Sequence, residues 1–164
     1  MAARRCLCVS QTPRIDTHFV HFVTAVFEIV YTSLATRDLG AAELTALLDQ
    51  ARRANQARGI TGMMMYRKRE FLQLLEGERA QVEALYERIA RDDRHQQMAK
   101  IWDGPIQERS CGEWEMAFLA PDDASLQSRP GYRDLMDRGL IAASGDSVGK
   151  KLLLNLRDDF LGGR

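Results

Sequence analysis

Cysteine is scarce in this sequence, and the three that occur, Cys6, Cys8 and Cys111, are unevenly spaced. Such a set excludes a disulfide framework as the basis of the fold and favours a reducing compartment such as the cytoplasm. No apolar run approaches the roughly 18 residues that a membrane-spanning helix needs. Net charge is also lacking, because 23 basic residues balance 23 acidic ones. A dedicated nucleic-acid surface needs a basic excess and is therefore not expected.

Several motifs of catalysis and cofactor binding are missing as well. The sequence contains no Walker-type glycine loop and no Gly-x-Gly-x-x-Gly fingerprint, which excludes the dinucleotide-binding manner of that motif. The sequence also shows no pattern of a Ser-His-Asp triad and no pair of carboxylates placed to line a catalytic pocket. Cys6 and Cys8 with His18 and His21 match no common zinc spacing, so no metal site is predicted. These absences give no support to an enzyme.

The composition suits one globular domain with appendages. The chain has 164 residues, of which 45% are hydrophobic and 28% charged, and this is enough to bury a sizeable core. Residues 1–22 are expected to be a disordered extension and not a signal peptide, because polar residues interrupt any apolar middle region. Residues 23–120 are expected to form the domain, and residues 121–164 a C-terminal helical appendage.

Two short apolar runs, Met63–Tyr66 and Phe71–Leu75, flank a charged four-residue stretch. This pattern predicts a β-hairpin with a polar tip. Side chains alternate along a strand, so Phe71, Gln73 and Leu75 share one face. Gln73 is therefore an amide on an otherwise apolar face, where a missing partner would cost about 1–3 kcal/mol. The partner is either another group of the protein or a polar ligand inserted against the strand.

The first helix is predicted to begin near Ala41, capped by Thr36 or Asp38 with Glu43 in its first turn, and to be stopped by Gly59. Asn55 falls on its apolar stripe and is thus a second inward amide, although an asparagine at a helix C-terminus is often a local cap. The stripe recurs at three- and four-residue steps and comprises Leu44, Leu47, Leu48, Ala51 and Asn55.

A second helix is predicted at about Ala80–Asp93. Arg88 and Asp92 lie four residues apart on it, the spacing of a surface ion pair worth about 0.3–0.5 kcal/mol. Alternatively, Arg88 and Arg94 can grip phosphate oxygens, because a guanidinium presents its donors as a fork. His95 follows the helix end, where a lone histidine is usually structural. The apolar stripe comprises Val82, Leu85, Tyr86 and Ile89.

The remaining strands are predicted at Val23–Ser33, within Met98–Gln107 and at Glu113–Leu119. Tyr31 lies at the end of the apolar face of the first of these strands. A tyrosine at such a position is more often a core residue with a hydrogen-bond partner than a functional group. The order β-α-β-β-α-β-β indicates a ferredoxin-like α+β sandwich, a mixed five-stranded sheet with two helices on one face. Short helices follow at Tyr132–Ile141 and Val148–Leu161, the latter with the stripe Leu152, Leu153, Leu156 and Phe160.

Six landmarks occur in order along this framework. They are YTS at 31–33, Asn55, GITG at 59–62, FLQLLEG at 71–77, DDRH at 92–95 and WEM at 114–116. Together they resemble the BLUF family, the blue-light sensors that use FAD, in its short stand-alone form. The match runs from about Val26 to Phe118, so the domain at 23–120 would be the flavin-binding one.

The resemblance implies that the flavin ring lies between the two helices, over the sheet. Tyr31 would give an electron and a proton to the excited flavin, Gln73 would be the switching amide beside it, and Asn55 would hold the ring's other polar edge. The resemblance also assigns cofactor contacts to Arg88, Asp92, Arg94 and His95, and signal relay to Ser33, Trp114 and Met116. Output would pass through the C-terminal helices to a separate effector protein, in a homo-oligomer that is a dimer or a larger ring.

Three departures from the family pattern stand out. Ala54 replaces the Asn or His that many members carry before the asparagine, which removes one polar contact to the flavin. The hairpin tip has Arg67-Lys68-Arg69 in place of a small turn residue and binds an anion or nothing. Ser110-Cys111-Gly112 stands where the family often has an aromatic. Two alternatives stay open: a flavin-using oxidoreductase, which would turn over NAD(P)H, and a flavin-free BLUF-like interaction module, which would be colourless.

Overall fold

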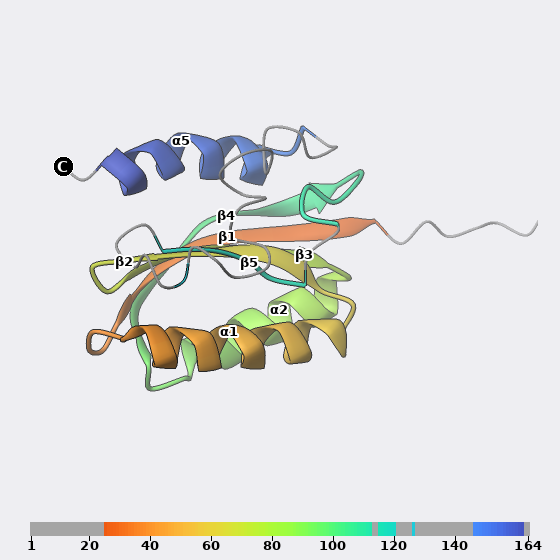
Figure 1. Ribbon diagram of the computed structural model, residues 1–164. Coiled ribbons are helices and arrows are strands. Elements are labelled where there is room, and N and C mark those ends of the chain that lie inside the picture. Colours follow the sequence, from red (N-terminus) through yellow and green to blue (C-terminus); the bar gives the residue numbers. More distant parts are fainter. Residues whose placement is uncertain (1–24, 113–114, 121–125, 127–145, 163–164) are drawn as a thin grey trace, which may run out of the picture.

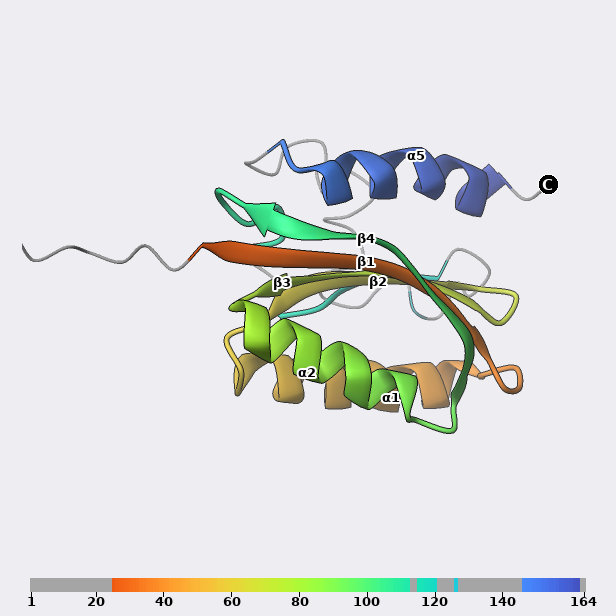
Figure 2. The same ribbon diagram turned by 180° about the vertical axis from the view of Figure 1, so that it is seen from behind.

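Three layers make up the described part of the molecule (Figure 1). The computed structural model describes residues 25–112, 115–120, 126 and 146–162. Helices α1 (Ala41–Gln56) and α2 (Arg79–Ala90) cover one face of a five-stranded sheet, and helix α5 (Val148–Gly162) covers the other. Figure 2 shows the same layers from behind. The prediction of two helices on one face is confirmed.

The sheet has the strand order β4-β1-β3-β2-β5. Its strands are β1 (Val26–Ala35), β2 (Thr61–Arg67), β3 (Glu70–Gly77), β4 (His95–Ile106) and β5 (Ala117–Leu119). β5 runs parallel to β2, whereas the other neighbours are antiparallel, so the sheet is mixed. This is the predicted ferredoxin-like α+β sandwich.

Strand β1 is buried on both faces because it has a neighbouring strand on each side and helices above and below. Phe27, Ile29 and Tyr31 belong to the core cluster on the α1/α2 side, as the alternation predicts. Val30 belongs to the cluster on the α5 side. Glu28 shares that second face and is fully buried. The strand ends two residues later than predicted, at Ala35.

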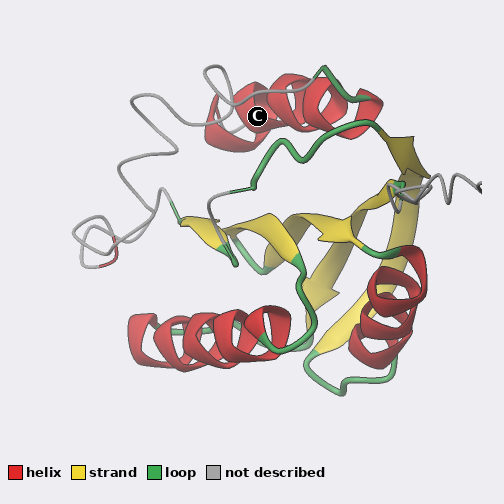
Figure 3. Ribbon diagram, turned by 90° about the vertical axis from the view of Figure 1, so that its right-hand side faces the viewer, coloured by secondary structure: helices red, strands yellow, loops and turns green. Residues whose placement is uncertain are grey.

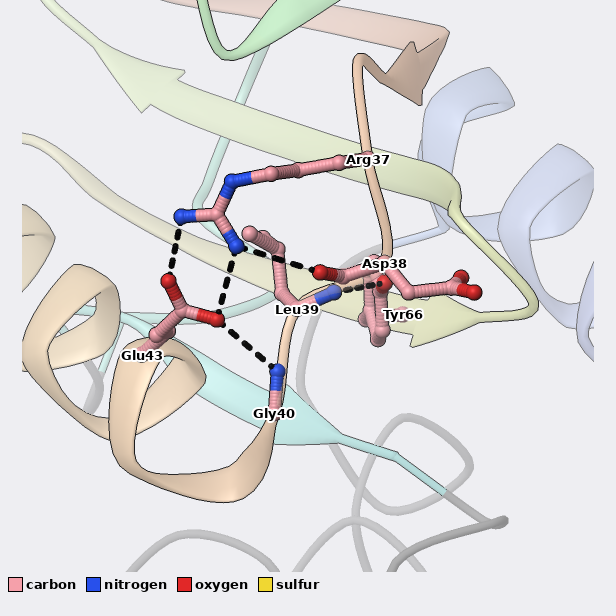
Figure 4. Close-up of polar contacts among 6 residues, drawn as sticks. All are labelled: Arg37, Asp38, Leu39, Gly40, Glu43 and Tyr66. Atoms are coloured by element: carbon pink, nitrogen blue, oxygen red, sulfur yellow. Dashed lines mark hydrogen bonds and ion pairs between the residues drawn. The ribbon is translucent and has the colours of Figure 1, made fainter.

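Helix α1 begins at Ala41 as predicted, but its cap differs from the prediction. The N-cap is Gly40, not Thr36 or Asp38. A glycine has no side chain to cap with, so Glu43 reaches back to accept a hydrogen bond from the Gly40 backbone N–H at 3.2 Å (Figure 4). Arg37 pairs with the same carboxylate, and the Leu39 N–H donates to the Tyr66 hydroxyl at 2.9 Å. These contacts fix the loop that enters the helix.

The β2–β3 hairpin turns on Lys68 and Arg69, which both have positive φ angles of 47° and 69°. Such turns usually use glycine or asparagine, because a Cβ atom is strained there. Here the Arg69 guanidinium offsets the strain by donating to the Ala35 carbonyl at 2.8 and 3.0 Å and to the Thr36 carbonyl at 2.9 Å. Arg67 donates to the Phe160 carbonyl at 2.5 Å. Two of the three tip cations thus hold backbone oxygens of the protein.

Several predicted boundaries shift. α2 ends at Ala90, three residues early, and β4 begins at His95, three residues before the predicted stretch. β5 is a three-residue strand at Ala117–Leu119, much shorter than the predicted Glu113–Leu119, and Met116 lies just before it.

Helix α5 packs its apolar side onto the second face of the sheet. Leu153 is fully buried there, and Leu154, Leu156 and Phe160 pack against the same cluster. The predicted stripe had Leu152 together with Leu153, Leu156 and Phe160. In the structure Leu154 and not Leu152 packs against this cluster with the other three. Within the described residues, no helix is long and apolar enough to cross a membrane.

Some predictions concern residues that the structure does not describe. These are the extension at 1–22 with Cys6, Cys8, His18 and His21, the helix Tyr132–Ile141, and Trp114. The boundaries at 23, 120 and 121 also remain predictions.

Candidate functional site

A cavity opens between α1, α2 and the sheet face that they cover, on the side opposite α5 (Figure 3 shows the layers end-on). Its walls are mostly apolar, and they include the polar or charged side chains of Gln50, Asn55, Gln73 and of the segment Arg88–His95. The lining includes Ala54, Asn55, Met64, Gln73, Arg88, Asp92, Arg94, His95 and Met116, with further apolar walls from Leu47, Leu75, Leu85 and Ile89.

Tyr31 and Gln73 meet at the floor of this cavity. They are direct partners across the β1–β3 ladder, and the Tyr31 hydroxyl donates a hydrogen bond to the Gln73 Oε1 atom. Tyr31 is fully buried, and Gln73 is 4% exposed. The alternation of β3 puts Gln73 on the helix-covered face, as predicted. Gln73 lines the cavity, and its partner Tyr31 lies behind it in the core.

The Tyr31 ring packs against another aromatic ring, and its hydroxyl is buried away from water. Tyr86 of α2 meets it edge-on, with ring centroids 5.2 Å apart. Burial raises the pKa of the Tyr31 phenol well above its ordinary value, and the neighbouring Tyr86 adds to the rise. The phenol is therefore a firmly protonated donor to Gln73 at neutral pH.

Asn55 ties α1 to the segment that leads into β5. Its side-chain amide donates to the Glu115 carbonyl at 2.6 Å, a contact between residues far apart in the sequence. The side chain is therefore not a local helix cap, the commoner alternative. Arg52, one turn earlier, donates to the Met116 carbonyl at 3.1 Å. Both contacts hold Met116 at the wall of the cavity.

Asp92 and Arg94 form the charged end of the cavity. Arg94 donates to both carboxylate oxygens of Asp92, at 2.8 and 2.5 Å, and to Gln50 at 3.2 Å. This pairing holds the pKa of Asp92 down to about 2, chiefly through the Arg94 hydrogen bond. Of the two alternatives for Arg88, the ion pair with Asp92 does not form, because α2 ends at Ala90 and Asp92 pairs with Arg94 instead. Arg88 lines the cavity.

His95 lines the cavity beside Asp92 and Arg94 and contacts Ser33 of β1. Its Nδ1 atom lies 2.9 Å from the Ser33 hydroxyl, and its ring packs on Phe71 with centroids 4.8 Å apart. Burial lowers the pKa of His95 below its ordinary value of 6.5. Ser33, predicted as a relay residue, is thus joined to a predicted cofactor residue.

The structure brings all but one of the predicted site residues to this cavity or its immediate neighbours; the exception, Trp114, is outside the described residues. The sequence analysis missed Gln50, which holds Arg94, and Met64, which faces Gln73 across the β2–β3 ladder. Gln50 lies one turn before Ala54 on the cavity side of α1, so helical spacing could have identified it. Strand alternation could likewise have placed Met64 beside Gln73.

This donor set suits a flat, largely apolar ring with a polar edge and an anionic tail. Leucine, isoleucine and methionine side chains provide faces for a ring, and the amides of Asn55 and Gln73 provide both donors and acceptors. The guanidinium groups of Arg88 and Arg94 stand at one end, where a phosphate could be bound. A flavin nucleotide has this combination of parts.

A family model described as BLUF, sensors of blue-light using FAD, matches residues 26–117. The β subunit of the photoactivated adenylate cyclase of Euglena gracilis is 31% identical over 116 residues, and its counterpart in Euglena longa is 32% identical over 111 residues. These matches cover 70% and 67% of this chain but only 13% of each relative. The chain thus spans about an eighth of their length.

Solved structures show the same relationship. A bacterial light-regulated adenylyl cyclase is similar with a TM-score of 0.59 and 26% identity, over 82% of this chain and 34% of the cyclase. The photo-activated state of BlsA is similar with a TM-score of 0.58 and 26% identity, over 80% of this chain and 93% of BlsA. BlrB, a BLUF protein in its dark state, shares the fold with a TM-score of 0.58 at 24% identity, over 85% and 92% of the two chains. This chain belongs to the BLUF family of blue-light-sensing, flavin-binding domains.

Proposed function

We propose that this chain is a blue-light photoreceptor that holds FAD in the cavity between α1 and α2 and acts as a sensor and not as a catalyst. The observation that carries the proposal is the buried hydrogen bond from Tyr31 to Gln73 at the floor of that cavity. The flavin supplies a strong electron acceptor when it absorbs blue light. The odd number of cysteines supports a reducing compartment such as the cytoplasm as its setting.

The lining residues suit separate parts of FAD. Asn55 would hold one polar edge of the ring and Gln73 the other, with the leucine and isoleucine side chains against its faces. Arg88 and Arg94 would bind the phosphates, because a guanidinium matches phosphate oxygens in a forked geometry. Asp92 keeps Arg94 in place through two hydrogen bonds, and His95 closes the same end. FAD is proposed over FMN because two arginines stand at this end.

Tyr31 and Gln73 would form the light-driven switch. A phenol gives up an electron and a proton together more readily when an acceptor for the proton is already in contact, and Gln73 Oε1 is in contact. An amide has a donor end and an acceptor end, so its rotation or tautomerisation inverts the hydrogen-bond pattern that it offers. After the switch, Gln73 would present a different pattern to the flavin edge and to the neighbouring strands.

Each altered hydrogen bond contributes roughly 1 kcal/mol net, which is enough to bias a nearly balanced element and too little to unfold one. We therefore propose small displacements, relayed through Ser33, Trp114 and Met116 to the C-terminal helices. A separate effector protein, or another subunit of a homo-oligomer, would read the change. The solvent side of α5, with Lys151, Asn155 and Asp159 exposed, offers a surface for such a partner.

The test is an absorption spectrum of the purified chain in darkness and after blue illumination. A flavin band that shifts slightly to the red and recovers in darkness supports the proposal. Gln73→Leu should abolish the shift, whereas the exposed control Gln81→Leu on α2 should keep it. A normal shift in Gln73→Leu would refute the switch assignment. A chain that stays colourless with added FAD would favour a flavin-free interaction module, and turnover of NAD(P)H would favour an oxidoreductase.

A further inference from the structure

Glu28 is a buried carboxyl group on the face of β1 that points away from the flavin cavity. Its exposed fraction is 0%. Its Oε1 atom accepts hydrogen bonds from the Trp102 indole N–H of β4 at 2.9 Å and from the Gly149 backbone N–H of α5 at 2.8 Å. One oxygen atom thus joins three elements of the fold, and two of them are neighbouring strands.

Gly149 lies in the first turn of α5, where backbone N–H groups have no partner within the helix. A Cβ atom at this position would lie 2.6 Å from Glu28 Oε2 and 2.7 Å from the Glu28 carboxyl carbon. Only glycine therefore allows the helix to approach the carboxyl group this closely. Oε2 itself is buried and has no hydrogen-bond partner among the described residues. In the part of the chain that the structure describes, Oε1 thus accepts two hydrogen bonds and Oε2 none. A small displacement of the carboxyl group would therefore change which donors it binds.

The same ladder carries Glu28 and the proposed switch. Tyr31 pairs with Gln73, and Glu28 pairs with Glu76, in one register of β1 against β3. The two pairs are three residues apart, about 10 Å along the strands. Tyr31 and Gln73 face the cavity, whereas Glu28 faces α5. A shift of β1 relative to β3 at the first pair therefore moves the second pair on the opposite face.

We propose that Glu28 is the positioning residue that couples the light response to helix α5. The proposal rests on the proposed function, because it uses the Tyr31–Gln73 switch as its input. When Gln73 re-pairs, the β1–β3 ladder shifts, Glu28 moves away from Gly149, and the Gly149 N–H at the start of α5 loses its acceptor. The other end of α5 stays tied by the Arg67 contact to the Phe160 carbonyl, so α5 pivots on that end.

A purely structural role for Glu28, as a cap that only holds α5 in place, makes a different prediction. Such a cap would stabilise the helix equally in darkness and in light. The distinguishing measurement is therefore the light dependence of the Gly149 amide. Its neighbours provide internal references, because the Lys150 N–H donates to the Ser147 hydroxyl and the Lys151 N–H to the Ser147 carbonyl.

The experiment is amide hydrogen exchange by NMR on the full chain with FAD bound, in darkness and under continuous blue light. We expect the Gly149 amide to exchange at least tenfold faster in light, with smaller changes at the amide of Asn155 in mid-helix. Equal exchange at Gly149 in darkness and light, in a sample whose flavin band shifts normally, would overturn the coupling and leave the proposed function intact. A sample without any flavin shift would overturn both.

Two variants test the contact itself. Glu28→Ala should make the Gly149 amide exchange rapidly in darkness and in light, while the flavin band still shifts. Gly149→Ala should do the same without removing the carboxyl group, because the Glu28 carboxyl group must move away to admit the added Cβ, although alanine favours a helix more than glycine does. Asn155→Ala, an exposed change in the same helix, is the matched control and should keep the light dependence. Slow dark exchange at the backbone amide of residue 149 in the Gly149→Ala variant would overturn the proposal.

Discussion

At the scale of single residues, the site depends on polar groups that have one good partner in a dry environment. Tyr31 and Gln73 satisfy each other, and removing either leaves the other buried and unsatisfied. Ser33 and His95 form a second pair beside the cavity, in which Ser33 is buried and His95 partly buried. Under the proposed function, substitutions at these positions should affect both stability and the light response, and the two effects need matched controls.

Tyr31→Phe should abolish the light-induced flavin shift and lower the free energy of unfolding by about 1–3 kcal/mol, because Gln73 Oε1 loses its buried donor. Spectra and urea unfolding measure the two effects. Tyr66→Phe is the matched control, since it also removes a phenol that binds a partner, the Leu39 N–H, but lies outside the proposed switch. A Tyr31→Phe chain that still shifts would contradict the role of the phenol.

His95 should make stability depend on pH below its ordinary pKa. Burial lowers the pKa of His95 in the folded chain below 6.5, so the unfolded chain binds this proton more readily. The free energy of unfolding should therefore fall as the pH drops from about 6.5 towards the folded-state pKa. Urea unfolding of the native chain and of His95→Gln between these limits measures the effect. Parallel pH profiles of the two chains would show that His95 does not contribute.

At the scale of the elements, the sequence predicts burial well and partners poorly. The three- and four-residue spacing of α1 and the alternation of β3 place Asn55 and Gln73 inward, because periodicity reports which face is buried. The partners depend on tertiary neighbours. Asn55 binds the Glu115 carbonyl, and Asp92 binds Arg94 because α2 stops at Ala90.

The unpredicted local details have similar physical causes. The N-cap of α1 escaped the sequence analysis because Gly40 has no capping side chain and Glu43 does the capping from inside the helix. The hairpin turn is unusual because Lys68 and Arg69, and not glycine or asparagine, have positive φ angles. The side chain of Arg69 stabilises this turn by donating to the Ala35 carbonyl. The roles in light sensing came from family resemblance, since burial alone does not distinguish a switch from a core tyrosine.

Gly62→Ala should disrupt the β2–β3 pairing, because the new Cβ would lie 2.2 Å from the Leu74 carbonyl oxygen, a backbone atom that cannot move aside. We expect a loss of about 1–3 kcal/mol or more in the free energy of unfolding. Gly40→Ala, where nothing lies within 4 Å of the added atom, is the control and should lose about 0.5 kcal/mol. Chemical denaturation compares the two chains, and equal losses would contradict this account.

At the scale of the whole molecule, one sheet separates two apolar clusters. The cluster on the α1/α2 side borders the cavity in which we propose that FAD binds, and the cluster on the other side receives α5. Substitutions of similar size in the two clusters should therefore have similar effects on stability and different effects on the chromophore.

Leu153→Ala and Leu85→Ala test this separation. Each removes a buried leucine and should cost about 2–5 kcal/mol of unfolding free energy, less at the 7% exposed Leu85. Leu85 lines the cavity, so its variant should alter the dark flavin spectrum or FAD affinity, whereas Leu153→Ala should leave both unchanged. Absorption titration with FAD measures the difference. An altered dark spectrum in Leu153→Ala would mean that the two faces are not independent.

Strand β1 is enclosed on both sides, and its side chains alternate between them. Odd-numbered positions such as Ile29 and Tyr31 border the helix-covered core, and even-numbered positions such as Glu28 and Val30 border α5. Under the proposed function, substitutions at odd-numbered positions should therefore alter the flavin spectrum, and substitutions at even-numbered positions should alter the contact with α5, within one ten-residue segment. A register shift of one residue would move every side chain of β1 to the opposite face and so disrupt both the core under α1 and α2 and the contact with α5.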